Sequence, residues 1–325
     1  MAAGANHACA IDRTGEVLCW GDNDARQLGI DCGSACVTPV RVTLEAPAVA
    51  LELTATSSCA LLRDRSVACW GDRKSVARTG GSPAKRLVGG APGACRLDEQ
   101  GALSCGGNNH LGRLGFPANE TDPPWLQRPA RVPVPEPVNG AFIAYQLGCA
   151  ATASQNLFCW GSPLDCAGPV RIELPGRVRE LTGNEGALCV LTTRGEVFAA
   201  SEYREPAGAG CQDFPFVLEG PLATGARAVA CHASPQSGCS DCAGCVIRDD
   251  RSVACWHGST SGQGALPKLE PVAGLAGATQ VSVGRGFACA LTGAGKLLCW
   301  GDNRLGQLGR GATTEGAAPA EPAFP

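Results

Sequence analysis

The sequence predicts an all-β protein assembled from a short repeated unit, and three observations lead to this prediction. Glycine and proline are frequent, with 44 and 23 of 325 residues, and both residue types interrupt helices. Cysteines recur in pairs ten residues apart along the whole chain. Successive pairs begin on average about 47 residues apart, so seven units account for nearly the entire length.

Six copies of the unit carry both cysteines, and a seventh carries only the first. The complete pairs are Cys9 and Cys19, Cys59 and Cys69, Cys95 and Cys105, Cys149 and Cys159, Cys245 and Cys255, and Cys289 and Cys299. In the seventh copy Cys189 is followed ten residues later by Ala199. We therefore expect a single domain over residues 1–325, whose seven repeats have hairpins at about 9–19, 59–69, 95–105, 149–159, 189–199, 245–255 and 289–299.

The nine residues between paired cysteines have the pattern of a two-stranded hairpin. In the first copy, a turn centred on Thr14 places Cys9 opposite Cys19 and Ile11 opposite Val17. Directly opposed residues of antiparallel strands have Cα atoms about 4.5–5.5 Å apart, a distance that a disulfide can span. We therefore predict six cross-strand disulfides, one in each complete pair.

The last position of the three-residue turn is predicted to be left-handed, a conformation that glycine adopts most easily. Glycine occupies this position in four copies, as Gly15, Gly101, Gly195 and Gly295. Other residues occupy it in the remaining three, as Arg65, Gln155 and Arg251. In these three copies we expect either a different turn or a strained residue.

Both faces of the hairpin are apolar, so both faces must be covered. Leu191 and Val197 share one face of the fifth copy, whereas Val190 and Phe198 share the other. Strand-like segments flank the hairpins, and some of them begin with proline, which suits an edge strand. Small sheets stacked side by side around a ring satisfy this pattern. We predict a seven-bladed β-propeller of four-stranded antiparallel blades, with the ring closed by the two termini, which supply complementary parts of one blade.

Eight of the 20 cysteines lie outside the six complete pairs. Cys32 and Cys36 enclose a short loop and are expected to pair. The other six allow fifteen pairings, among which the sequence does not choose; they are Cys166, Cys189, Cys211, Cys231, Cys239 and Cys242. The segment from Cys231 to Cys245 also contains His232 and has the residue types of a zinc site. Because Cys245 is already assigned to Cys255 and the cysteine count is even, disulfides are the preferred interpretation.

The composition also restricts the compartment and the partners. So many cysteines indicate an oxidising compartment, and we expect an extracellular, periplasmic or cell-surface protein. A net charge of −3 argues against a nucleic-acid partner, and no apolar run has the length of a membrane span. The N-terminus lacks the basic and apolar segments of an export signal, so we expect that signal to have been removed, with Met1 replacing a native residue.

The last copy carries a recognisable set of motifs. These are Gly284-Arg285-Gly286-Phe287-Ala288-Cys289, Leu298-Cys299-Trp300-Gly301-Asp302-Asn303 and Leu305-Gly306-Gln307-Leu308-Gly309. The first copy is nearly as complete, the third retains part of the set, and the middle copies have lost most of the terminal motif. The chain thereby resembles, over its whole length, the repeat family named after the regulator of chromosome condensation. This resemblance implies a seven-bladed propeller used mostly as a protein-binding platform, and the many cysteines are similar to those of exported bacterial members.

We predict a non-catalytic protein-binding scaffold that acts through loops on one face of the ring. No nucleophile or phosphate-binding motif is present, and the Gly-Asp-Asn segments favour turn formation over calcium binding. We expect no cofactor, no metal, an unknown protein partner and a monomer. The alternative is an enzyme with a small-molecule site at the central channel. A guanine nucleotide exchange factor, the activity of the family's eukaryotic namesake, is a weaker alternative because this chain is slightly acidic and rich in cysteine.

Several aromatic and polar residues have expected roles. Five tryptophans follow the second cysteine position and are predicted to pack between blades; they are Trp20, Trp70, Trp160, Trp256 and Trp300. Trp125 lies instead in a proline-rich insertion and is the candidate partner-binding residue, unless it covers the rim of its own blade. His7 is expected to have a structural role in the turn into the first hairpin. Asn119 begins a glycosylation sequon.

Overall fold

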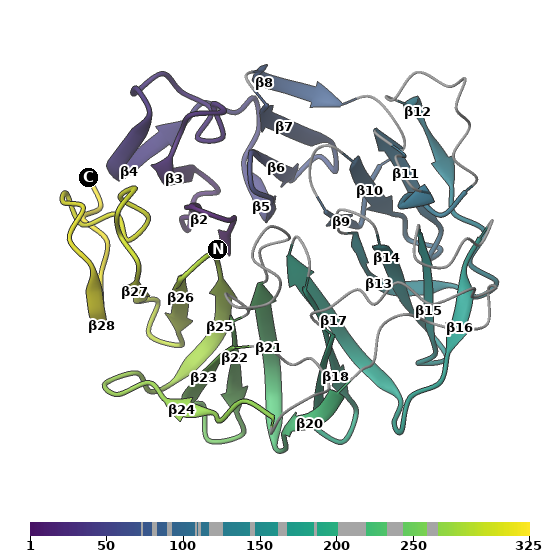
Figure 1. The fold of residues 1–325 in the computed structure, drawn as a ribbon. Helices are drawn as coiled ribbons and strands as arrows, with labels where there is room; N and C mark the ends of the chain where they lie inside the picture. Colours follow the sequence, from purple (N-terminus) through teal and green to yellow (C-terminus); the bar gives the residue numbers. More distant parts are fainter. Residues whose placement is uncertain are drawn as a thin grey trace.

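A computed structural model describes residues 1–72, 74–79, 83–89, 93–107, 109, 112–116, 126–143, 147–161, 168–184, 187–200, 219–232, 243–258 and 266–325. These residues form seven antiparallel sheets of four strands each, arranged as blades around a central axis (Figure 1). The predicted seven-bladed β-propeller is therefore confirmed. Within each blade the strands follow one another in chain order, from the innermost strand to the outermost.

Strands of the same rank occupy equivalent places in the seven blades. The innermost strands are β1 (Ala2–Ala3), β5 (Ala48–Leu53), β9 (Arg86–Val88), β13 (Val138–Ile143), β17 (Val178–Asn184), β21 (Ala226–His232) and β25 (Ala278–Val283). The second strands are β2 (His7–Ile11), β6 (Ser57–Leu62), β10 (Gly93–Leu97), β14 (Leu147–Thr152), β18 (Ala187–Thr192), β22 (Ala243–Arg248) and β26 (Phe287–Thr292). The third strands are β3 (Val17–Asp22), β7 (Val67–Gly71), β11 (Leu103–Gly107), β15 (Leu157–Gly161), β19 (Val197–Ala200), β23 (Val253–His257) and β27 (Leu297–Gly301). The outer strands are β4 (Ala35–Val42), β8 (Lys74–Thr79), β12 (Leu126–Arg131), β16 (Val170–Ile172), β20 (Glu219–Ala223), β24 (Glu270–Pro271) and β28 (Gly316–Ala320).

The cysteine pairs mark the predicted register of the hairpins. Cys9 lies opposite Cys19, and the six disulfides of this kind have Cα–Cα distances of 4.0–4.1 Å. In the first blade the Asp12 amide donates to the Glu16 carbonyl at 3.0 Å, so Asp12 and Glu16 form a hydrogen-bonded pair. Since the two kinds of pair alternate, Cys9 and Cys19 form a non-hydrogen-bonded pair, in which the Cα atoms lie closer together.

All seven hairpin turns have a left-handed residue at the predicted position. The glycines there have φ values between 75° and 94°. The non-glycine residues do not change the turn, because Arg65, Gln155 and Arg251 have φ values of 67°, 64° and 64°. Of the two expectations for these three copies, the strained residue is therefore the observed outcome.

The two ends of the chain meet at the junction between the first and last blades. The Ala3 amide donates to Ser282 Oγ at 2.9 Å, and the Arg285 amide donates to the Ala5 carbonyl at 2.7 Å. The ends do not share a blade, however, because β1 to β4 form one sheet and β25 to β28 form another. The prediction that the termini supply complementary parts of one blade is therefore wrong. The ring is closed by packing between two complete blades.

The hydrophobic core lies between neighbouring blades. Side chains alternate between the two faces of each strand, so every blade contributes to two interfaces. At the junction of the first and last blades, for example, Trp20 and Ala8 are buried against Phe287 and Leu308. In the described part of the chain, no helix has the length and apolar character needed to cross a membrane.

Candidate functional site

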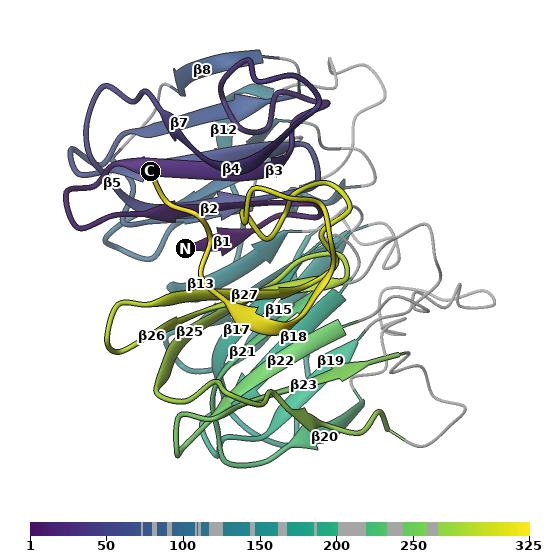
Figure 2. The same cartoon turned by 90° about the vertical axis from the view of Figure 1, so that its left-hand side faces the viewer.

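The strand order places the variable connections on one face of the ring. In a four-stranded antiparallel blade, the connection from the first to the second strand and that from the third to the fourth leave at the same end. The connections after the third strands range from residues 72–73 to residues 108–125 and 201–218. We call this side the loop face and the opposite side, which carries the hairpin turns, the turn face. Figure 2 shows the ring from the side, with the connections that follow β3 and β27 directed the same way.

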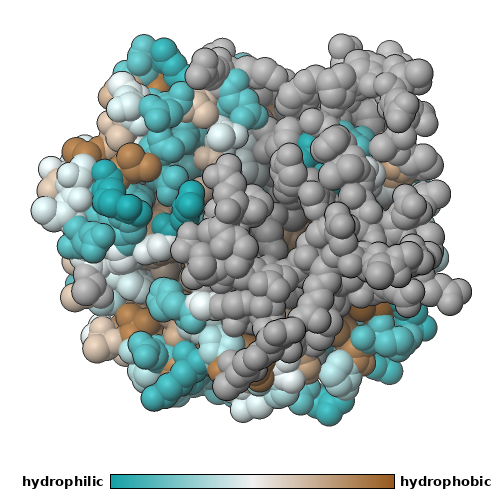
Figure 3. All heavy atoms as spheres, in the orientation of Figure 1, coloured by the Kyte–Doolittle hydropathy of each residue, from teal (hydrophilic) through white to brown (hydrophobic). Residues whose placement is uncertain are grey.

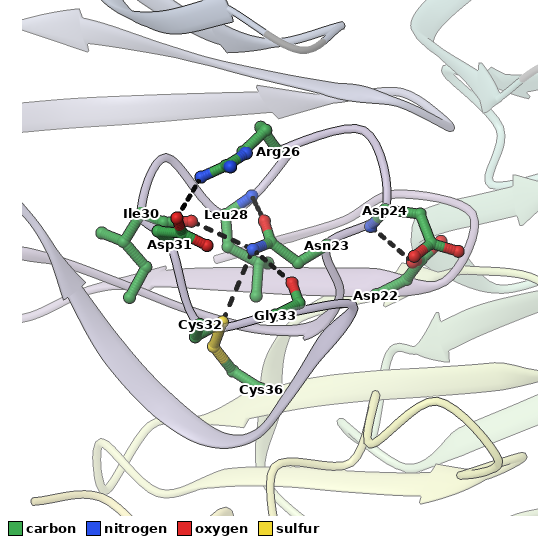
Figure 4. Close-up of a disulfide and its surroundings, with 10 residues drawn as sticks. All are labelled: Asp22, Asn23, Asp24, Arg26, Leu28, Ile30, Asp31, Cys32, Gly33 and Cys36. Atoms are coloured by element: carbon green, nitrogen blue, oxygen red, sulfur yellow. Dashed lines mark hydrogen bonds and ion pairs between the residues drawn. A yellow bond between two sulfur atoms is a disulfide. The ribbon is translucent and has the colours of Figure 1, made fainter.

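Asparagine side chains organise three connections on the loop face. Asn23 Nδ2 donates to the carbonyls of Ile30 (3.0 Å) and Gly33 (3.1 Å), while its Oδ1 accepts from the Leu28 amide (Figure 4). Equivalent bonds are made in two other blades, by Asn303 to Ala312, Thr314 and Leu308, and by Asn109 to Phe116 and Leu114. The predicted turn-forming role of these segments is therefore confirmed. Among the residues that the structure describes, no group of three or more His, Cys, Asp or Glu side chains could hold a metal ion.

The first connection on the loop face has additional constraints. A disulfide joins Cys32 to Cys36, with a Cα–Cα distance of 6.0 Å, and Arg26 forms an ion pair with Asp31 at 3.0 Å (Figure 4). Arg26 has a φ of 64°, although the equivalent residue in the last blade is Gly306. This connection is therefore held in one shape by a disulfide, an amide side chain and an ion pair.

Tryptophan side chains connect neighbouring blades through hydrogen bonds. The Nε1 atoms of Trp20, Trp70 and Trp160 donate to the carbonyls of residues in the preceding blade, which are Gln307 (2.9 Å), Gln27 (2.9 Å) and Arg113 (2.8 Å). A glycine two residues further along lies against each indole, and these glycines are Gly309, Gly29 and Gly115. The predicted packing of these three tryptophans between blades is confirmed. These tryptophans and glycines therefore hold neighbouring blades together.

His7 also connects two blades. Its Nε2 lies 2.9 Å from Ser58 Oγ, and Ser58 Oγ donates to the Gln27 carbonyl at 2.8 Å. Because the single hydroxyl hydrogen of Ser58 is used in that bond, His7 Nε2–H must be the donor to Ser58. Burial lowers the pKa of His7 to about 3, so the ring is neutral at physiological pH. His7 is structural, as predicted, but its partner belongs to the neighbouring blade.

The fifth blade departs from the repeat in its disulfide. Cys189 on β18 pairs with Cys231 on β21, with a Cα–Cα distance of 6.3 Å, and this disulfide joins two blades. Cys189 lies opposite Ala199, so no partner is available within its own hairpin. Cys231 and Cys245 are both in disulfides, so neither is available as a zinc ligand, which favours the disulfide interpretation of this segment. Several predicted residues lie outside the described part of the chain, namely Trp125, Asn119, Cys166, Cys211, Cys239 and Cys242.

Three blades carry a charged residue on the innermost strand, which lies next to the axis of the ring. Arg86 on β9 and Glu180 on β17 hold equivalent positions, since they pair with Leu97 and Leu191 of their second strands. Blade 4 lies between these two blades and has Gly140 at the same position. A Cβ atom added to Gly140 would lie only 3.4 Å from Arg86 Nη1, so the guanidinium lies against this glycine. Glu52 on β5 lies one level further along the axis, opposite Cys59.

These axial groups influence one another through their charges. Burial raises the pKa of Glu52 to about 7, and the positive charge of Arg86 partly opposes this shift. Burial likewise raises the pKa of Glu180, against the opposing charges of Arg86 and Arg179. Glu52 and Glu180 keep partial solvent contact and Arg86 is exposed, so these side chains do not lie in a closed core. These residues were not predicted from the sequence, although a glutamate between Leu51 and Leu53 on a predicted innermost strand was a usable signal.

The turn face has a cavity of about 640 Å³ between blades 4 and 5. Three arginines line it, namely Arg171, Arg177 and Arg194. Carboxylates of the same region balance these charges, because Glu173 pairs with Arg171 at 3.3 Å and Glu196 lies 3.9 Å from Arg194. Figure 3, which views the ring from its loop face, shows mainly hydrophilic side chains with scattered hydrophobic ones over the described parts.

Comparisons with known proteins agree with the repeat and with the fold. The family described as "Regulator of chromosome condensation (RCC1) repeat" matches residues 1–27 and 278–307, which lie in the first and last blades. The crystal structure of human WBSCR16 aligns with a TM-score of 0.72 and 16% identity, covering 96% of this chain and 95% of that chain. No curated protein sequence matches this chain.

Two further crystal structures show the same fold in other proteins. Yeast RCC1 (Prp20), in a structure with Kap60 bound, aligns with a TM-score of 0.57 and 19% identity over 98% of this chain and 73% of that chain. The ectodomain of the Arabidopsis thaliana receptor kinase ACR4 aligns with a TM-score of 0.57 and 16% identity over 98% of this chain and 94% of that chain. At these identities the similarity shows a shared fold.

Proposed function

We propose that this chain is a non-catalytic scaffold that binds a protein through its loop face, and the match of its first and last blades to the regulator of chromosome condensation repeat supports this proposal. The proposal is based on a difference within each blade between the repeated residues and the variable connections. Repeated cysteine, tryptophan and asparagine side chains, together with His7, hold the frame, whereas the connections after the third strands differ in length and composition. Variable loops on a rigid frame are a common basis for recognition.

The similar structures support a binding role. Yeast RCC1 (Prp20) was crystallised with Kap60 bound, and a second structure of Prp20p is described with its binding properties to Gsp1p and histones. The ACR4 propeller is the ectodomain of a receptor kinase. A nucleotide exchange activity for this chain would rest on the yeast relative alone, so protein binding is the broader proposal.

Disulfides support a location outside the cytosol. Eight occur within the described residues, and such a number fits an oxidising extracellular environment. We propose that the protein acts in the extracellular space, the periplasm or at the cell surface, and that it is a monomer with a single domain.

Affinity capture with loop-face variants tests the proposal. The immobilised protein is incubated with the extracellular or envelope fraction of its source organism, and retained proteins are identified by mass spectrometry. Two variants, Trp125→Ala in the proline-rich insertion and Arg26→Ala on the loop face, are compared with the turn-face control Arg194→Ala. Trp125 is included because an aromatic side chain on a proline-rich insertion is a typical interface anchor.

We expect one partner to be retained by the wild type and the control and to be lost or weakened by a loop-face variant. If Trp125→Ala and Arg26→Ala both retain the partner and Arg194→Ala loses it, the binding surface lies on the turn face and the proposal is wrong. Conversion of a small molecule by the purified protein, without a protein partner, would favour the enzyme alternative.

A further inference from the structure

We infer that the axis of the ring binds a small zwitterion, a molecule with a carboxylate and an ammonium group, between Arg86 and the carboxyl groups of Glu52 and Glu180. This inference does not depend on the loop-face function. It rests on the positions of three charged residues on the innermost strands of blades 2, 3 and 5, at two successive levels along the axis. Blade 4 contributes Gly140 at the level of Arg86 and Glu180, so this position places no side chain between them.

The equivalent positions of three further blades carry small or uncharged side chains. Ala50 and Ala228 hold the positions equivalent to Gly140 in blades 2 and 6, as shown by their pairing with Leu61 and Ile247. Gln280 holds this position in blade 7, and its Oε1 lies 3.5 Å from the amino nitrogen of Met1. Small residues at three of the seven positions provide room at the level of Arg86.

The charged groups have unused hydrogen-bonding capacity. Within the described part of the chain, the structure gives no hydrogen bond and no ion pair for the side chains of Glu52, Arg86 and Glu180. Nevertheless, Arg86 is close enough to both glutamates to shift their pKa values. A guanidinium with five donors and two carboxyls with free acceptors therefore lie near one another without contact. A bound carboxylate would accept from Arg86, and a bound ammonium would donate to Glu52 or Glu180.

Binding of simple probes to the intact protein tests this inference. Glycine and L-alanine carry both groups, whereas acetate and methylammonium each carry one. Binding is measured by calorimetry and by ligand-observed NMR with the wild type, Arg86→Met and Glu52→Gln. Arg41→Met and Glu16→Gln are matched controls, because these residues pair with each other at the exposed outer edge of blade 1.

We expect saturable binding of at least one amino acid, stronger than the binding of acetate or methylammonium. Arg86→Met and Glu52→Gln should each weaken it about tenfold or more, since each removes charge-assisted hydrogen bonds, while the controls bind like the wild type. Two results would overturn the inference: no saturable binding of either amino acid, or binding that both axial variants leave unchanged. Equal binding of acetate would also contradict it, because an anion site alone does not need the glutamates. If Arg86→Met does not fold, Arg86→Lys and Glu52→Gln decide the question.

Discussion

At the scale of single residues, the hairpin turn shows how a backbone requirement overrides side-chain preference. The third turn residue is left-handed in every blade, and four blades meet this requirement with glycine. The other three hold arginine or glutamine there at a cost of roughly 1–2 kcal/mol each relative to a right-handed position. The surrounding strand pairing, including the disulfide two pairs away from the turn, is strong enough to impose the conformation.

Replacement of Gln155 by glycine should therefore stabilise the protein. Relief of the left-handed strain outweighs the greater freedom of glycine in the unfolded chain, so the free energy of unfolding should rise by about 0.5–1 kcal/mol. Gly295→Ala is the matched reverse change, because the nearest atom to a Cβ there is Arg13 Nη2 at 3.6 Å and no clash results. It should lower the free energy of unfolding by a similar amount in denaturant titrations. Equal stability of both variants and the wild type would show that the turn is not strained.

Glu52 should give the protein a stability that depends on pH. Its pKa in the folded state, about 7, lies above the ordinary value of 4.5, so the folded state binds the proton more tightly. The stabilisation from protonated Glu52 is complete below pH 4.5 and is lost as the pH rises through about 7. Glutamine remains neutral at every pH. Glu52→Gln should therefore unfold at a higher temperature than the wild type at pH 8 and at nearly the same temperature at pH 4.5.

The control for this prediction is Glu16→Gln, a change at an exposed carboxylate of the outer edge. Its difference from the wild type should not follow the same profile between pH 4.5 and 8. The opposite trend for Glu52→Gln, with the largest increase in unfolding temperature at acidic pH, would contradict the partial burial of this side chain. The titration of His7 acts in the opposite direction, since its lowered pKa makes the free energy of unfolding fall as the pH decreases below about 6.5. This contribution is the same in the variant and the wild type, so it does not affect their difference.

At the scale of elements, the fifth blade shows that a cysteine of the repeat can form a disulfide with a residue of another blade. Its hairpin has alanine at both the second cysteine position and the tryptophan position that follows, Ala199 and Ala200. The first cysteine instead reaches β21 of the next blade. This disulfide joins blade 5 to the following blade, whereas a tryptophan at position 200 would face the preceding blade, as Trp20, Trp70 and Trp160 do.

Removal of the Cys189–Cys231 disulfide should destabilise the protein more than removal of a hairpin disulfide. In the loop-entropy relation, a separation of 42 residues corresponds to roughly 4 kcal/mol and one of ten residues to roughly 3 kcal/mol. We compare the double variant Cys189→Ala, Cys231→Ala with Cys9→Ala, Cys19→Ala in denaturant titrations. Peptide mapping without reduction should recover the Cys189 and Cys231 peptides as one species. A free thiol at either residue would exclude this pairing.

At the scale of the whole molecule, the ring is closed by contacts between residues almost 300 positions apart. Trp20 donates to the Gln307 carbonyl and meets the ring of Phe324 edge to face, with centroids 6.0 Å apart. These contacts repeat the interblade geometry found within the chain, as at Trp70 and Gln27. Closure is therefore one more junction of the same kind, made without a continuous chain.

Trp20→Phe should loosen the first and last blades together. The change removes the indole donor and leaves the buried Gln307 carbonyl without it, a loss of about 1–3 kcal/mol. Hydrogen exchange should accelerate in both β1 to β4 and β25 to β28, which are remote in sequence. The control Trp70→Phe should affect blades 1 and 2 instead. Acceleration confined to blade 1 after Trp20→Phe would show that the junction does not couple the two ends.

The sequence by itself determined the repeat, the hairpin register and the six hairpin disulfides. Pairing across a short turn is local, so a spacing of ten residues and the alternation of side chains are sufficient to specify it. The structural use of the tryptophans and asparagines could also be predicted, because their positions recur in every well-preserved copy. The same regularity indicated seven blades.

Only the tertiary structure decided how the blades meet. The complete first blade, the Cys189–Cys231 pairing and the partner of His7 depend on which residues of separate blades lie side by side. The axial group of Glu52, Arg86 and Glu180 likewise combines three blades and the empty position of Gly140 in a fourth. No local pattern encodes these contacts, because each depends on the rotation between neighbouring blades, which follows from the packing of their faces around a closed ring.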